Sequence, residues 1–432
     1  DSLYDKPLFS ECIWTTRDGA VALSAWRPSG DLAAERTRVA ALPRAEQGAM
    51  RCAVLPQPAR VNLRPVTFHL RVRGGAVQFV DIVDASWVEV PAATPLRPAL
   101  AAALATVRLP TFPAKFDDDY RRDVALLTGQ TALPGGLLLR RKNSADPQHQ
   151  LEALVDYLQA RYTALGLRTH RQQFLWRGIQ QSNLIAILPA SPSAPSTPSA
   201  TAATENRPIA LADHIDTAFS QDVYDAKHRE RDPLARRVSA PGADDNVTAT
   251  ATLLRAAEVL RALPRKHDIW ILHLTGEEFP ADDLGARQHV AQLLNDRRDL
   301  GALLLLDMTG YNPQHRREFQ LNPGGLAAAG HDAMQIAALS ALLSPRVAPR
   351  LVPVVRPPTD LHSYLYNTDG LIYAEHGFPV LFFNEVMNRY RLGRQGYHDS
   401  HDTLANIDVP YAAGIARVAI ATAAALSQTG LP

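Results

Sequence analysis

Histidine and carboxylate residues recur through the second half of the chain at positions suited to binding metal. Each follows an apolar run typical of a strand or lies in a turn-rich loop: His214, Asp244, Glu278, Asp307 and His398. Two zinc ions about 3.5–4 Å apart need two His, one bridging acid and one further acid each. The chain offers that set, and Glu277, adjacent to Glu278, adds a carboxylate that could act as general base. The sequence therefore predicts a hydrolytic site with two Zn²⁺ ions.

The adjacent acids Asp244 and Asp245 have a simpler interpretation if the other His and acid positions are left aside. Asp244 and Asp245 follow a Pro-Gly turn signal, and the apolar helical run 247–254 comes directly after them. Carboxylates at a helix start are favoured by the helix dipole and the free backbone N–H groups. An isolated pair would be an ordinary helix cap, and the other His and acid positions favour the metal site.

Strands and helices alternate regularly around these positions. Predicted strands cover 208–212, 268–274, 302–306 and 380–383, and predicted helices cover 247–263, 284–294, 331–343 and 411–426. This alternation predicts an α/β fold with a mostly parallel sheet that has helices on both faces. Such a sheet delivers the residues that follow its strands to one edge, where binding sites form.

The chain also changes character along its length. Residues 1–105 show short alternating runs separated by Pro and Gly, which predicts a small β-rich domain of unknown role. Residues 106–115 are interpreted as a linker, and 116–432 as the α/β catalytic domain. An amphipathic helix is expected over 148–165, and a low-complexity surface loop over 190–206.

Charge and composition exclude some classes of partner. The 432 residues are 46% hydrophobic, and 45 Lys plus Arg nearly balance 44 Asp plus Glu. Nucleic-acid binding needs a basic field that this balance does not supply. We see no apolar run long enough to span a bilayer, and so expect no membrane span. Peptides are the expected substrates.

The two cysteines lie in the N-terminal hundred residues. Cys12 and Cys52 have no metal-ligand spacing with each other or with a nearby His. Two free thiols and one disulfide both fit the sequence, and we favour a disulfide because both residues belong to one small domain. A disulfide would fit an exported protein, periplasmic or extracellular, which is the expected location.

Five motifs together carry a family resemblance. They occur in one order over residue 116 to the C-terminus: His214-Ile215-Asp216, Pro241-Gly242-Ala243-Asp244-Asp245-Asn246, Glu277-Glu278, Leu306-Asp307-Met308-Thr309 and Tyr397-His398-Asp399-Ser400-His401-Asp402-Thr403. The chain resembles the co-catalytic zinc aminopeptidase family of the bacterial leucyl aminopeptidase type. That family is related to glutamate carboxypeptidases and glutaminyl cyclases.

The resemblance implies a division of the ligands. Asp244 would bridge both metals, with an unusual cis peptide bond to Asp245. Each metal would then take one imidazole and one further acid: His214 with Asp307, and His398 with Glu278. His401, three residues after His398, is a rival ligand, and the motif spacing favours His398.

The resemblance also implies roles outside the ligand set. Glu277 would be general base and acid, and Asp216 would orient His214 through a hydrogen bond, as zinc-bound imidazoles commonly require. Thr368-Asp369 resembles the family's Ser-Asp pair, with Thr in place of Ser.

The leading functional hypothesis is a zinc-dependent aminopeptidase, an exopeptidase that removes N-terminal residues from peptides through a metal-activated water. A carboxypeptidase on the same fold would need a cationic clamp, for which Arg389, Arg391 and Arg394 are candidates. A single-zinc glutaminyl cyclase is a further alternative. A non-catalytic binding protein is disfavoured by the complete ligand set with both Glu277 and Glu278.

Overall fold

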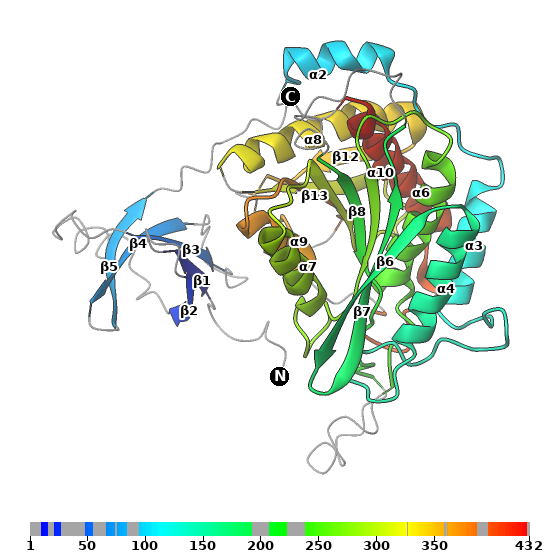
Figure 1. Ribbon diagram of the computed structural model, residues 1–432, viewed down its shortest axis with the longest axis horizontal. Helices are drawn as coiled ribbons and strands as arrows, with labels where there is room; N and C mark the ends of the chain where they lie inside the picture. Colours follow the sequence, from blue (N-terminus) through cyan, green and yellow to red (C-terminus); the bar gives the residue numbers. More distant parts are fainter. Residues whose placement is uncertain are drawn as a thin grey trace. The chain divides into compact units, whose positions relative to one another are not determined.

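The computed structural model describes residues 95–191, 207–222, 238–325, 327–357, 360, 362–386 and 396–429, and the backbone of five N-terminal strands (Figure 1). The chain divides into two compact units. One comprises residues 1–91 with 358–366, and the other comprises 92–357 with 367–432. The expected low-complexity loop lies outside the described residues from position 192 onward.

The first unit contains an antiparallel sheet in the strand order β2-β1-β3-β4-β5. Its strands are β1 Ser10–Thr15, β2 Val21–Trp26, β3 Gly48–Val54, β4 Val66–Arg73 and β5 Ala76–Val83. The alternating sequence pattern predicts these strands. In the β1–β3 register Cys12 is the partner of Cys52, and the disulfide between them stays a prediction.

The second unit is built on an eight-stranded sheet in the order β12-β11-β13-β10-β8-β9-β7-β6. The strands are β6 Arg168–Trp176, β7 Ile179–Leu188, β8 Ile209–His214, β9 Ile269–Leu274, β10 Ala302–Leu306, β11 Glu318–Gly324, β12 Val352–Val355 and β13 Val380–Glu385. The neighbours β13, β10, β8 and β9 are parallel, whereas β7 pairs antiparallel with β9 and β11 with β13. The mostly parallel α/β fold is thus confirmed.

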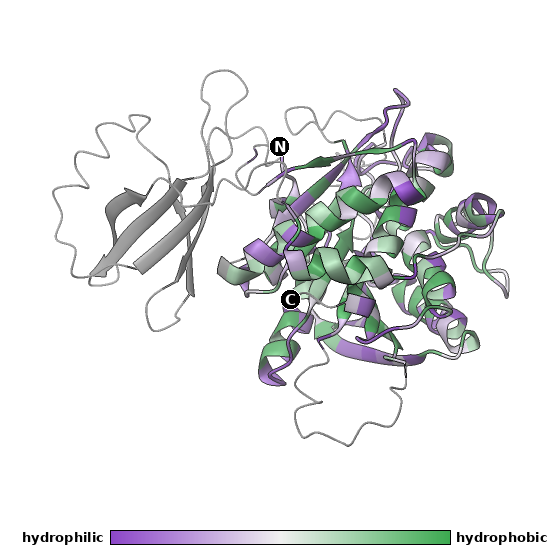
Figure 2. Cartoon of the chain, turned by 90° about the horizontal axis from the view of Figure 1, so that it is seen from above, coloured by the Kyte–Doolittle hydropathy of each residue, from purple (hydrophilic) through white to green (hydrophobic). Residues whose placement is uncertain are grey.

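Helices cover both faces of this sheet (Figure 1). The helices are α2 Pro98–Ala103, α3 Phe116–Leu127, α4 Leu151–Ala164, α6 Thr248–Leu260, α7 Leu284–Asn295, α8 Ala327–Val347, α9 Asp369–Glu375 and α10 Val409–Thr429. Among the described residues, a cluster of buried apolar side chains joins one face of the sheet to α3, α4, α6, α8 and α10. The helices α7 and α9 pack against each other and contact strands of the same sheet. Hydrophobic residues run along the helices and central strands of this unit (Figure 2).

Helix α10 is an exception to the expected lack of a membrane-length apolar run. Its 21 residues have a window with mean hydropathy 1.5, long and apolar enough to cross a bilayer by length and composition. However, 89% of that window is buried inside the protein. Here a long apolar helix forms the centre of a helical layer.

The sequence pattern does not predict two strands of this sheet, β11 and β12. Strand β11 contains Asn322 and Pro323, residue types depleted in strands, and β12 has four residues including a proline. Asn322 is buried and donates from Nδ2 to Oδ1 of Asn384 on β13 at 2.9 Å. The polar positions of β11 are thus paired with β13, while Phe319 and Leu321 at the alternate positions are buried in the apolar cluster.

Candidate metal centre

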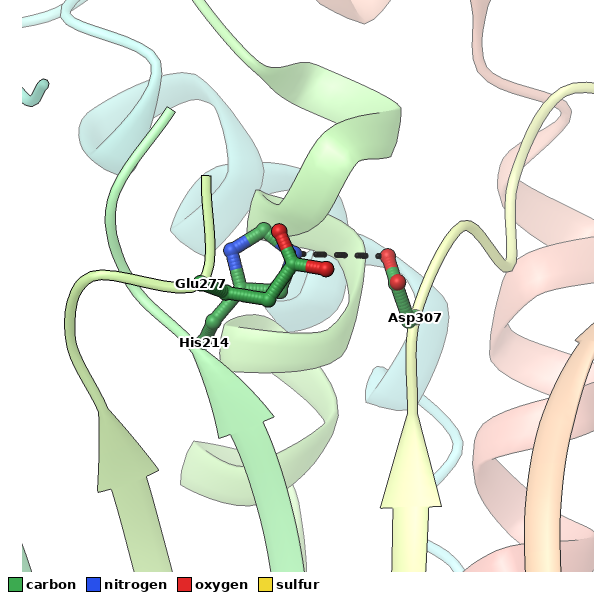
Figure 3. A group of neighbouring side chains, drawn as sticks. All are labelled: His214, Glu277 and Asp307. Carbon is green, nitrogen blue, oxygen red and sulfur yellow. Dashed lines mark ion pairs between the residues drawn. The ribbon is translucent and has the colours of Figure 1, made fainter. Parts of the chain in front are cut away.

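Three neighbouring parallel strands deliver side chains to one edge of the sheet. His214 is the last residue of β8, Glu277 and Glu278 follow β9, and Asp307 follows β10. Because β8 lies between β9 and β10, the carboxyl ends of the three strands meet. Figure 3 shows His214, Glu277 and Asp307 converging beyond these strand ends. The strand order reverses around β8, which is where α/β sheets form binding crevices.

The central carboxylate of the site belongs to Asp245. Its Oδ1 lies 3.3 Å from Nε2 of His214, and its Oδ2 lies 3.2 Å from Nε2 of His398. One buried carboxylate thus faces both imidazoles, one oxygen to each. This is the arrangement expected of a bridging ligand.

Asp244, the residue expected to bridge, contacts a different part of the chain. Its Oδ1 accepts backbone N–H bonds from Gly310 at 2.7 Å and Tyr311 at 3.1 Å, beyond the end of β10. Asp245 has the non-helical dihedral angles φ −113° and ψ 85°, so the two adjacent side chains diverge at this kink. The cis peptide bond also differs from the expectation, because it joins Asp245 to Asn246.

The remaining acids divide between the two imidazoles. Asp307 Oδ1 lies 3.5 Å from Nε2 of His214, and Glu278 Oε2 lies 3.3 Å from Nε2 of His398. Glu277 Oε2 is more distant from Nε2 of His214, at 3.9 Å. The structure thus brings together every predicted ligand except Asp244, with Asp245 in its place.

These spacings fit a pair of zinc ions. Ligand atoms about 2.0–2.1 Å from a tetrahedral zinc lie about 3.3 Å from each other. The separations between each imidazole and its carboxylates, 3.2–3.5 Å, match this value, whereas Glu277 lies outside it. The donors are imidazole nitrogens and carboxylate oxygens, which zinc prefers. The residues present therefore fit two such ions.

The electrostatics of the site favour a cation in the same place. Burial and then the neighbouring charge of Asp245 raise the pKa of Glu278 to about 8, against the effect of His398. Burial also raises the pKa of Glu277 well above its usual value, and Glu278 and Asp307 add to this. Carboxylates crowded in a buried site take up protons unless another positive charge compensates them.

Against the effect of burial, the carboxylates around the His214 imidazole raise its pKa. Burial by itself lowers its pKa, but the charge of Glu277 and hydrogen bonds to the surrounding carboxylates outweigh burial, so the pKa lies well above the usual value. For Asp245, burial opposes ionisation, and hydrogen bonds from both imidazoles prevail and lower its pKa. The two imidazoles thus stabilise the ionised form of the Asp245 carboxylate.

Asp216 contacts both His214 and the turn that follows β9. Nδ1 of His214 lies 3.1 Å from the backbone carbonyl oxygen of Asp216 and 3.7 Å from its carboxylate. The carboxylate also accepts the backbone N–H groups of Gly276, Glu277 and Glu278 at 2.8, 3.1 and 3.2 Å. Asp216 therefore holds the turn that carries both glutamates, while its backbone orients His214.

The sequence also offered candidates outside the main ligand set. Thr368 caps α9 by accepting the N–H of Gly370, and Asp369 is buried. His401 is mostly exposed, and its Nε2 lies 3.9 Å from Asp222, away from the ligand set. Arg389, Arg391 and Arg394 lie outside the described residues.

Sequence reasoning missed a further carboxylate that supports the bridge. Asp402 is buried, and it accepts the backbone N–H groups of Asp244 at 2.9 Å and Asp245 at 3.1 Å. Its position four residues after His398 in the last motif was the available signal. Asn246 adds a second support, because its side chain bonds the backbone of Leu306 and Met308 on either side of Asp307.

Comparisons with known proteins agree with this architecture. A search of curated protein sequences finds no match. Among solved structures, the LapA aminopeptidase of Legionella pneumophila is similar with a TM-score of 0.52 and 14% identity, covering 77% of this chain and 76% of that one. The glutaminyl cyclase of Fimbriiglobus ruber gives 0.52 and 16%, covering 74% and 98%. The glutaminyl cyclase of Macrostomum lignano gives 0.52 and 16%, covering 73% and 94%.

These likenesses show a shared fold. The sequence itself matches the model of peptidase family M28 over residues 197–423, just over half of the chain. This range includes the strand ends and the loops that carry the ligand set described above. The suspected family is thereby confirmed: the chain belongs to peptidase family M28.

Proposed function

We propose that this protein is a zinc-dependent aminopeptidase that hydrolyses N-terminal residues from peptides. The observation that carries the proposal is the carboxylate of Asp245, with one oxygen 3.3 Å from His214 and the other 3.2 Å from His398. In the proposed centre Asp245 would hold both zinc ions. His214 with Asp307 would hold one of them, and His398 with Glu278 the other. Membership of a peptidase family supports the hydrolysis of peptides.

The proposed reaction assigns proton transfer to Glu277. Zinc ions held in such a site lower the pKa of a water molecule and polarise a peptide carbonyl. Glu277 lies beside the ligand set, with its Oε2 3.9 Å from Nε2 of His214, and a carboxylate in that position can serve as general base and then as general acid. It accepts a proton as the water oxygen attacks the carbonyl carbon. It then donates that proton to the leaving amine as the C–N bond breaks.

The surrounding residues keep Glu277 in place for both transfers. The N–H of Glu277 donates to Asp216, and so do the N–H groups of its neighbours Gly276 and Glu278. A general base held by its backbone can approach the reacting atoms without a large reorganisation. We propose Asp216 as a positioning residue on this basis.

A glutaminyl cyclase is the alternative on the same fold. The cyclases of Fimbriiglobus ruber and Macrostomum lignano resemble the chain in fold. Such an enzyme would release ammonia from N-terminal glutamine without consuming water. The ligand spacing of the His214–Asp307 pair, 3.5 Å, favours a second metal and hence the aminopeptidase.

The test compares Glu277→Gln with Glu278→Gln on an aminoacyl chromogenic substrate. We expect Glu277→Gln to lose activity by about 10²–10⁴-fold while keeping its zinc, because a general base is removed. Glu278→Gln should lose zinc, because a ligand is weakened. Near-normal turnover by Glu277→Gln would rule out the proposed mechanism. Zinc loss in Glu277→Gln alone would reverse the two roles.

A further inference from the structure

Three consecutive polar side chains are buried just before α4, away from the proposed ligands in sequence. Lys142, Asn143 and Ser144 are exposed by 0%, 0% and 1%, and we call them the 142–144 segment. A fully buried lysine is rare in proteins unless its ammonium is paired. Burying three polar side chains in succession costs free energy unless each finds partners. The partners of this segment therefore indicate what it is for.

Lys142 contacts the loop that leads to the bridging carboxylate. Its Nζ donates to the carbonyl oxygen of Pro241 at 2.9 Å and to that of Leu127, the last residue of α3, at 2.7 Å. Burial lowers the pKa of Lys142 to about 7, and the nearby charge of Asp402 opposes this. Pro241 stands four residues before Asp245, so this contact joins the start of the bridging loop to α3.

Asn143 contacts the loop that follows β8. Its Nδ2 donates to the carbonyl oxygen of Thr217 at 2.8 Å. The backbone N–H groups of Lys142 and Asn143 both donate to Oγ of Ser239, at 3.0 and 3.1 Å. The same two residues are thus tied to the chain just beyond His214 and to the chain just before the bridging loop.

Ser144 contacts the turn that carries the two glutamates. Its Oγ donates to Oδ2 of Asp216 at 3.0 Å. The same Asp216 carboxylate holds the backbone N–H groups of Gly276, Glu277 and Glu278. Ser144 therefore supplies a side-chain donor in a group of four that fixes the Asp216 carboxylate.

We propose that the 142–144 segment is a positioning device that sets the separation of the metal-binding loops. Each of its side chains holds a different part of the site: the approach to Asp245, the chain after His214, and the turn bearing Glu277 and Glu278. The partners of its side-chain donors are backbone carbonyl groups and Asp216, so these residues act through others and do not touch the reacting atoms. The inference rests on the proposed function, because it assumes that these loops hold zinc.

The affinity of a metal site depends on residues that orient its ligands without binding the metal. Residues that orient ligands typically change metal affinity by about 10–100-fold when they are removed. A buried polar network contributes specificity only while its members are satisfied. Loss of one donor should therefore let one loop relax and weaken binding of zinc, without removing any ligand.

The experiment measures zinc affinity by competition with a chelator for the full chain and two variants. Ser144→Ala removes one hydroxyl, and Lys142→Met keeps an unbranched side chain that is one atom shorter and lacks the ammonium. We expect each to bind zinc about 10–100-fold more weakly than the wild type. The matched control is Ser340→Ala, which removes a buried hydroxyl whose partners, Ile336 and Thr422, lie on α8 and α10. This control should keep wild-type zinc affinity even where its thermal midpoint falls.

The outcomes separate this inference from the proposed function. A wild type that binds no zinc would overturn the proposed function and the inference together. A wild type that binds two zinc ions, with Ser144→Ala and Lys142→Met binding equally tightly, would overturn the inference alone. If Lys142→Met fails to fold, Ser144→Ala decides by itself. Equal weakening in Ser340→Ala would show a general loss of stability and would also contradict the inference.

Discussion

At the scale of single residues, the adjacent acids Asp244 and Asp245 contact different groups. Asp245 faces the imidazoles of His214 and His398, whereas Asp244 holds the backbone N–H groups of Gly310 and Tyr311. The first carboxylate belongs to the proposed metal centre. The second ties the kinked loop to the chain beyond β10.

This division predicts opposite results for two matched substitutions. Asp245→Asn removes the shared negative charge and should weaken zinc binding by more than about 100-fold, beyond the usual effect of a supporting residue. Asp244→Asn keeps an oxygen that can accept the Gly310 and Tyr311 N–H bonds, so its zinc content should stay close to that of the wild type. Metal analysis after dialysis measures both. Zinc loss confined to Asp244→Asn would restore that residue as the bridge.

Residue types and spacing predicted most of this site. His214, Glu278, Asp307 and His398 converge as their positions after apolar runs indicated. Which of two adjacent acids bridges could not be read from the sequence, because backbone dihedral angles at the kink decide it. Likewise, the contact between Ser144 and Asp216 joins residues 72 apart that no local pattern connects.

At the scale of elements, the loop that precedes α6 is closely packed against its neighbours. Gly242 has φ 63°, in the left-handed region that favours glycine. A Cβ at this position would lie 2.3 Å from Cγ2 of Thr217 and 2.5 Å from the carbonyl oxygen of Asp245. The loop therefore has room for glycine alone unless its neighbours move.

Gly242→Ala should disturb both folding and zinc binding. A non-glycine residue in the left-handed region costs on the order of 1–3 kcal/mol of stability. The clash with Asp245 should in addition lower zinc affinity by about tenfold or more, as for other changes beside a metal site. Denaturant unfolding and chelator competition measure the two effects.

Gly166→Ala is the matched control for this change. Gly166 also has a positive φ, 80°, but a Cβ there would meet nothing within 4 Å. It should lose stability through backbone strain and keep the zinc affinity of the wild type. If both variants bound zinc as the wild type does, close packing of the loop would not control the site.

The central elements of the fold were predictable, and the edges of the sheet were less so. Apolar runs of the length of β8, β9 and β10 indicate buried parallel strands. Strand β11 carries buried Gln320 and Asn322, and polar pairing with β13 stabilises it. Such pairing depends on a partner about 60 residues away, so local periodicity does not report it.

At the scale of the whole molecule, the first unit offers an independent prediction. Cys12 and Cys52 are register partners in the β1–β3 pair, so their backbones are neighbours. We expect a disulfide between them, as a protein exported from the cell would allow. Titration of the denatured, unreduced protein should find no free thiol, and a reduced sample gives the control value. Two titratable thiols without reductant would contradict this expectation.

The proposed centre would hold two zinc ions with the Asp245 carboxylate between them. Anomalous scattering at the zinc edge, from crystals of the protein soaked in excess zinc, tests it most directly. We predict two peaks about 3.5–4 Å apart, one on each side of the Asp245 carboxylate. The first should lie beside His214 and Asp307, and the second beside His398 and Glu278. A single peak beside His398 and Glu278 would contradict the account and favour the cyclase.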